Sequence, residues 1–121
     1  MELEPGRRAQ VSMTVTEADT AISLGSGDVP VLGTPAVLAL AEGAAVACVA
    51  DELEADETTV GSWAQLHHVA PSRVGAEVHA EAELTAVKGP RLEFRINVFE
   101  GETEVARVEH RRVVVERARF Q

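Results

Sequence analysis

The 121-residue sequence predicts an α+β fold in which a curved antiparallel β-sheet wraps around one long central helix. Two observations carry this prediction. One long segment, residues 34–50, is apolar and rich in small residues, and four segments with strand-like alternation follow it in succession. The sequence contains no internal repeat, low-complexity tract or linker. We therefore expect one domain that spans residues 1–121.

The first elements are an opening strand and a loop. Residues 9–16, AQVSMTVT, alternate and carry β-branched side chains, which favours a strand. Residues 23–33, SLGSGDVPVLG, hold three glycines and a proline. This composition disfavours regular structure and predicts a mobile loop.

Residues 34–50, TPAVLALAEGAAVACVA, predict the only long helix of the chain. Thr34 suits the N-cap and Pro35 the first helical position, where its missing N–H is not needed. The helix is apolar on almost every face, and its small side chains allow other elements to approach closely. We expect the sheet to wrap around it.

Four strands are expected after an acidic break, DELEADET. Turn residues separate them: Pro71 and Gly75, then Gly89 and Pro90, then Gly101. The expected strands cover residues 60–69, 77–87, 92–100 and 104–116. One strand, a loop, one buried helix and four consecutive antiparallel strands form the hot-dog arrangement.

Composition excludes several classes of protein. With 11 basic and 20 acidic residues the net charge is −9, which repels nucleic acid and anionic membrane surfaces. Three Phe, one Trp and no Tyr offer little for stacking on bases. The single cysteine, Cys48, cannot form an internal disulfide, and the first ten residues contain no apolar run. We expect a cytoplasmic protein without nucleic-acid or membrane partners.

Polar residues in an otherwise apolar setting indicate a site. Glu42 is the only charged residue between Thr34 and Ala50, so it must lie at a cleft, accept hydrogen bonds or be protonated. His67 and His68 end a strand, and alternation lets only one of them face the helix. A strand-end histidine is more often structural, but together with a helix-start Thr34 and a buried acid it offers acid-base chemistry.

Metal and cofactor chemistry find little support. The four histidines show no helical i, i+4 pair of the metallohydrolase type, so we expect no metal site. No G-x-S-x-G elbow, P-loop or dinucleotide-binding glycine pattern occurs. We expect a protein without cofactors.

The sequence resembles the fluoroacetyl-CoA thioesterase family of hot-dog thioesterases from about residue 31 to the last strand. The landmarks are Thr34, Glu42 eight residues later, the segment GSWAQLHH, and the tail VEHRRVVV. The resemblance implies an acyl-CoA thioesterase with Thr34, Glu42 and His68 as the catalytic group. It further implies that Gly61 contacts the thioester through its backbone and that Arg112 is a substrate-side or structural arginine. It implies a homodimer, or a tetramer made of two such dimers, with CoA only as part of the substrate.

Two features refine this expectation. No aromatic residue lies upstream of Thr34 to close a fluoroacetyl pocket, so we expect a short- or medium-chain acyl-CoA substrate. Eight helical residues separate Thr34 from Glu42 by roughly 12 Å, too far for both to touch one imidazole, which suggests a site shared between two chains. His68 would act as base toward water or Thr34, and Glu42 would orient the imidazole or attack the carbonyl.

Other functions stay open at this point. A hot-dog enoyl-thioester hydratase or dehydratase would use the same residue types without releasing thiol, and a non-catalytic acyl-CoA-binding module would turn nothing over. The phosphates of CoA require local cations on a chain of net charge −9; the candidates are Arg73, Arg91, Arg111 and Arg112.

Overall fold

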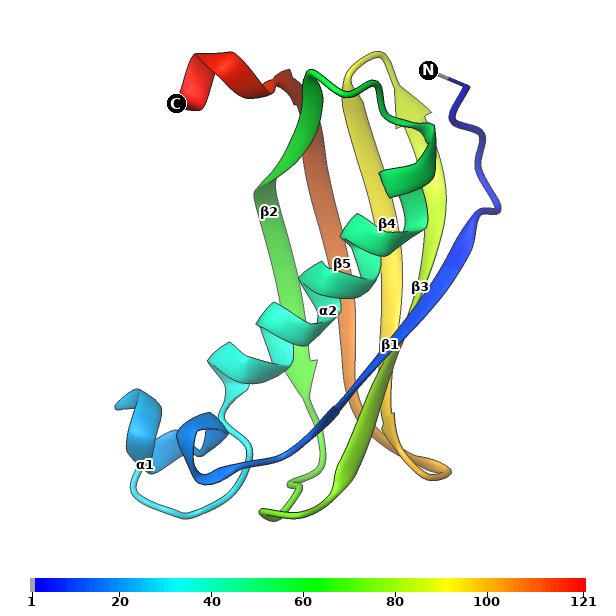
Figure 1. The fold of residues 1–121 in the computed structure, drawn as a ribbon. Helices are drawn as coiled ribbons and strands as arrows, with labels where there is room; N and C mark the ends of the chain where they lie inside the picture. The colour runs from blue at the N-terminus through cyan, green and yellow to red at the C-terminus, as the bar shows by residue number, and fades with distance from the viewer. Residues whose placement is uncertain (1) are drawn as a thin grey trace.

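The computed structural model, which describes residues 2–121, shows a five-stranded antiparallel sheet curved around one long helix (Figure 1). The strands are β1 (Arg8–Thr14), β2 (Glu57–His68), β3 (Glu77–Lys88), β4 (Arg91–Glu100) and β5 (Thr103–Glu116). The helices are the short α1 (Ala21–Leu24) and the long α2 (Thr34–Val49), with 3-10 turns at Glu17–Asp19, Ala50–Glu52 and Arg117–Phe120. The predicted fold class is confirmed, and the predicted element boundaries differ by three residues or fewer.

The strand order is β1-β3-β4-β5-β2, so the four later strands are not all neighbours in sequence order. β1 occupies the place beside β3, and β2 pairs with β5 instead. The described part of the chain leaves the other edge of β2 without a partner strand. β2 is therefore a long free edge.

The core lies between the concave face of the sheet and one side of α2 (Figure 1). Alternate residues of β4, among them Phe94 and Ile96, point inward and are fully buried. The buried residues of α2 are small or β-branched, which lets the helix lie close to the sheet: Val37, Ala41, Ala44, Ala45, Cys48 and Val49.

The sheet covers only one side of α2. Pro35, Ala39, Val46 and Ala47 on the other side are exposed. With the turn that follows, Thr34–Glu52 is long and apolar enough to cross a membrane by length and composition alone. Its packing on the sheet is that of the core helix of a folded domain. Within one chain, the sheet therefore wraps around one side of the helix and leaves the other side uncovered.

The loop before α2 is more ordered than its composition predicts. Ser23 and Leu24 belong to α1, Leu32 forms a β-bridge with Thr20, and Val31 forms one with Arg73. The Leu32 N–H donates to the carbonyl of Ser72 at 2.8 Å, and the Gly33 N–H donates to the carbonyl of Asp19 at 2.9 Å. These backbone bonds attach the loop to the β2–β3 connection and fix the start of α2.

The helix begins one residue earlier than predicted. The N-cap is Gly33, not Thr34, and it makes no side-chain cap. Thr34 is the first helical residue and Pro35 the second. The Thr34 hydroxyl is therefore not used by the helix backbone and is available to another partner.

Candidate active site

The structure brings Thr34 and His68 together. Thr34 Oγ1 lies 2.8 Å from His68 Nδ1. His68 ends β2 opposite Ala106, which is buried, whereas His67 faces the outer side of the sheet beside Arg107. The prediction that only one of the two histidines faces the helix is confirmed.

The environment of His68 suits a base. Burial lowers the pKa of the imidazole below its usual 6.5, and the backbone at Ala70 opposes this shift to a smaller extent. Nε2 is buried and makes no hydrogen bond within residues 2–121. A hollow of about 250 Å³ adjoins the ring, lined by Val31, His68, Val69, Ala70 and Pro71. A neutral imidazole with one unused nitrogen beside a hollow can exchange a proton with a bound molecule.

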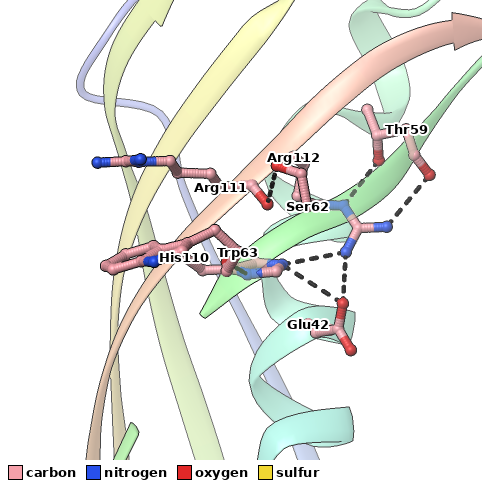
Figure 2. Close-up of polar contacts among 7 residues, drawn as sticks. All are labelled: Glu42, Thr59, Ser62, Trp63, His110, Arg111 and Arg112. Atoms are coloured by element: carbon pink, nitrogen blue, oxygen red, sulfur yellow. Dashed lines mark hydrogen bonds and ion pairs between the residues drawn. The ribbon is translucent and has the colours of Figure 1, made fainter. Parts of the chain in front are cut away.

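Glu42 lies in a second cluster, shown in Figure 2. Its Oε2 accepts a hydrogen bond from Arg112 Nη1 at 2.9 Å. Arg112 is 7% exposed and also donates from Nε to Thr59 Oγ1 at 2.9 Å and from Nη2 to the Thr59 carbonyl at 3.1 Å. The Glu42 side chain keeps 38% of its surface exposed. Of the predicted alternatives for Glu42, the structure shows a hydrogen-bonded carboxylate at the edge of the core.

Gly61 allows this cluster to form. A Cβ on Gly61 would lie 2.5 Å from Glu42 Oε2 and 3.3 Å from Arg112 Nη1. The pairing of β2 with β5 shifts register between Gly61 and Trp63, and this bulge sets Gly61 opposite Arg112. Strict alternation counted back from His68 assigns Gly61 to the outer face, so the bulge decides its position. Its predicted contact with the thioester stays a prediction.

His110 is a member of this cluster that the sequence analysis did not select. Its Nδ1 is 2.7 Å from the Trp63 carbonyl, and its Nε2 is 3.1 Å from Arg112 Nη1 and 3.4 Å from Glu42 Oε2 (Figure 2). The segment EHRR held a signal for it. His110 and Arg112 are two residues apart on one strand, so an inward arginine implies an inward histidine.

The two clusters are separate within one chain. Within residues 2–121, no hydrogen bond or ion pair joins Thr34 or His68 to Glu42 or Arg112. Eight helical residues span roughly 12 Å and seven strand residues roughly 23 Å, so the clusters sit at different points along α2 and β2. One protomer therefore does not bring its own Thr34, Glu42 and His68 into one site.

The candidate phosphate-binding arginines differ in their surroundings. Arg91 and Arg111 both lie within 4.0 Å of a Glu93 carboxylate oxygen. Arg111 also lies over the Trp63 ring, 4.5 Å from its centroid. Arg112 is buried in the Glu42 cluster, which favours the structural role over a phosphate contact. Within the described part of the chain, no group of three or more His, Cys, Asp or Glu side chains is placed to hold a metal ion.

Comparison with solved structures defines the fold. A thioesterase superfamily member from Thermus thermophilus superposes with a TM-score of 0.90 at 21% identity, covering 98% of this chain and 88% of that chain. A hot-dog-like protein from Thermanaerovibrio acidaminovorans gives 0.86 at 22% identity, covering 96% and 86%. At this identity the likeness concerns the fold, and the fold is the hot-dog fold.

The family follows from closer matches. A variant of the fluoroacetyl-CoA-specific thioesterase FlK superposes with a TM-score of 0.92 at 27% identity, covering 99% of this chain and 93% of that chain. The fluoroacetyl-CoA thioesterase of Streptantibioticus cattleyicolor is 32% identical over 90 residues, which are 74% of this chain and 65% of that protein, just under two thirds of its length. The family description "Fluoroacetyl-CoA-specific thioesterase" matches residues 15–118. The chain belongs to this family, and the resemblance noted in the sequence is confirmed.

Proposed function

We propose that the protein is an acyl-CoA thioesterase that hydrolyses a short- or medium-chain acyl-CoA to the acid and CoA. The observation that carries the proposal is the 2.8 Å contact between Thr34 Oγ1 and His68 Nδ1, next to a buried Nε2 that has no partner within residues 2–121. Membership in the fluoroacetyl-CoA-specific thioesterase family supports the reaction class.

The contact favours Thr34 as the group that His68 activates. When Nδ1 is unprotonated, the Thr34 hydroxyl donates to it, and transfer of that proton makes Oγ1 a nucleophile toward the thioester carbonyl. The C–S bond then breaks, and the protonated imidazole returns the proton to the CoA sulfur. Water hydrolyses the acyl-threonine with His68 as base and restores both residues. The Thr34 hydroxyl, the His68 imidazole and water suffice for these steps without a cofactor.

Glu42 joins this chemistry only if a second copy of the chain supplies it. The free edge of β2 fits antiparallel pairing with the β2 of a partner. Because the bulge adds one residue to β2 between Gly61 and Trp63, pairing that places His68 opposite Gly61 of the partner subunit puts the two-fold axis at Gln65. Residues 61–65 are exposed in the single chain, as such pairing requires. The homodimer proposed here thus builds each site from Thr34 and His68 of one protomer and Glu42 of the other.

The open side of α2 supports the same dimer. Its exposed residues Pro35, Ala39, Val46 and Ala47 are apolar and lie on the helix that carries Glu42. Burial of apolar surface stabilises association by about 25 cal/mol per Å² before the entropy cost. A partner that pairs along β2 would bring its own α2 toward this side. Further pairing of dimers into a tetramer remains part of the proposal.

The acyl chain is proposed to lie between α1 and the first turns of α2. A hollow of about 450 Å³ there is lined mostly by aliphatic side chains and by no aromatic one: Met13, Asp19, Leu24, Pro35, Ala36, Ala39 and Leu40. Pro35 follows Thr34 directly, so the hollow adjoins the proposed nucleophile. Flexible aliphatic walls suit a straight acyl chain better than selection for a single fluorine.

The proposed compartment is the cytoplasm. Cys48 is a free, buried thiol, and its pKa is raised chiefly by burial, so it is an unreactive core residue suited to a reducing environment.

Thiol release tests the function. Wild type is assayed with acetyl- through decanoyl-CoA, phenylacetyl-CoA and fluoroacetyl-CoA, together with His68→Ala, Glu42→Gln, Thr34→Val and Thr34→Ser. The proposal expects release by the wild type, a loss of about 10²- to 10⁴-fold in His68→Ala, and more activity in Thr34→Ser than in Thr34→Val. Hydration of an enoyl-CoA without thiol release would assign the protein to a different reaction class.

A further inference from the structure

We propose that His110 is a positioning residue. It is a neutral imidazole that carries its proton on Nδ1, accepts an N–H from Arg112 at Nε2, and so fixes the Arg112–Glu42 pair. This inference rests on the proposed function, because it assigns His110 the task of orienting the carboxylate that the partner's site uses.

The hydrogen bonds of His110 determine its tautomer. The Trp63 carbonyl, 2.7 Å from Nδ1, can only accept, so Nδ1 carries the proton. The guanidinium of Arg112, 3.1 Å from Nε2, can only donate, so Nε2 carries the lone pair. Both contacts are satisfied only by the neutral Nδ1–H form.

The surroundings of His110 keep it in this form. The side chain is buried, and burial together with the Arg112 charge lowers the pKa of His110, while the Trp63 carbonyl and Glu42 oppose the shift. Phe94 of β4 packs near the ring, with centroids 6.3 Å apart. A protonated ring would direct an N–H at Arg112 and compete with it for Glu42 Oε2, 3.4 Å away.

Arg112, which His110 and Thr59 hold in place, fixes the position of the Glu42 carboxylate. Its Nε and Nη2 are held by Thr59, and the two hydrogens of Nη1 serve Glu42 Oε2 and His110 Nε2. The planar guanidinium is thus fixed along both edges. Arg112 binds Glu42 through Oε2 alone, and no hydrogen bond to Oε1 occurs within residues 2–121. Oε1 is left available to a substrate or water.

A purely structural role makes a different prediction. An apolar ring could fill the same volume beside Phe94, but it would leave the Trp63 carbonyl and one Arg112 N–H without partners. The specific property of histidine is an N–H and a lone pair on opposite sides of one flat ring. Two substitutions separate these functions, because one keeps only the donor and the other keeps only the acceptor.

His110→Asn and His110→Gln form a matched pair. The Asn amide reaches the position of Nδ1 and can still donate to Trp63, but nothing replaces Nε2; the Gln amide reaches the position of Nε2 and can accept from Arg112. For the best substrate we expect His110→Asn to lower kcat by about 10- to 100-fold with little change in KM, because a hydrogen bond to a charged group is lost. We expect His110→Gln to stay within about 3-fold of wild type, since it keeps the acceptor. Equal loss in both folded variants, or no loss in either, overturns the inference.

Nuclear magnetic resonance tests the inference without turnover. The ¹⁵N signals of the imidazole should show the Nδ1–H tautomer at neutral pH, and the ¹³C signal of the Glu42 carboxylate should move in His110→Asn but not in His110→Gln. An Nε2–H tautomer or an unmoved Glu42 signal would contradict the proposal. If the wild type releases no thiol from any substrate, the proposed function fails, and these spectra alone still decide whether His110 positions Glu42.

Discussion

Replacing Gly61 with alanine is the most direct perturbation of the Glu42 cluster. The added Cβ would lie 2.5 Å from Glu42 Oε2, and ordinary contact requires roughly 3.5 Å. The carboxylate must therefore move by about 1 Å, since it ends a flexible side chain whereas Gly61 is fixed by the bulge. A displacement of this size in a catalytic group costs about 100-fold in rate, or ~2.7 kcal/mol of transition-state stabilisation.

Stability should change far less than activity. Glu42 is 38% exposed, so weakening its bond to Arg112 should cost no more than about 1 kcal/mol of folding free energy. Replacing a strand glycine with alanine restricts the unfolded chain and raises the free energy of unfolding by roughly 0.5–1 kcal/mol. The two terms nearly cancel, so we expect Gly61→Ala to melt close to the wild-type temperature.

The assay is thiol release at saturating acyl-CoA, with a thermal melt of each protein. Glu42→Gln provides the control background: if Gly61→Ala acts by displacing the Glu42 carboxylate, the two losses should not add. A folded Gly61→Ala protein with wild-type kcat would refute the reasoning, and so would a 100-fold loss that persists undiminished in the Glu42→Gln background.

Four further predictions concern pH, assembly and substrate. Because burial lowers the pKa of His68, the pKa that governs the acid limb of the kcat/KM profile should lie below 6.5. A governing pKa above 6.5 would exclude His68 as the essential base. Since the pKa values of His68 and His110 are both lowered on folding, the unfolded chain binds more protons just below pH 6.5; the free energy of unfolding should decrease as pH falls through that window, as chemical denaturation at several pH values will show. Gln65→Cys should form a disulfide-linked dimer on oxidation, whereas Gln10→Cys on the opposite edge strand should not. Non-reducing electrophoresis detects the covalent dimer, and a dimer of Gln10→Cys but not of Gln65→Cys would contradict the proposed interface. In the acyl-CoA panel, kcat/KM should increase from acetyl to longer aliphatic chains, and a preference for fluoroacetyl-CoA above all others would contradict the role given to the aliphatic hollow.

The sequence by itself determined the local elements and one half of the site. The continuous apolar run and small side chains of residues 34–50 specified α2, and turn residues delimited the later strands. Alternation was enough to place His68 and His67 on opposite faces, because a strand that is regular over its last residues has a fixed period of two. Helix rise was enough to separate Thr34 from Glu42.

The tertiary structure decided what these residues contact. The place of β2 beside β5 depends on long-range strand pairing, which no local period encodes, and it creates the free edge proposed to bind a second chain. The bulge after Gly61 reverses the phase of β2, so counting along the strand assigns Gly61 to the wrong face. The partners of Glu42 come from β5, 68 and 70 residues further along the chain, and only the folded sheet brings His110 and Arg112 to that carboxylate.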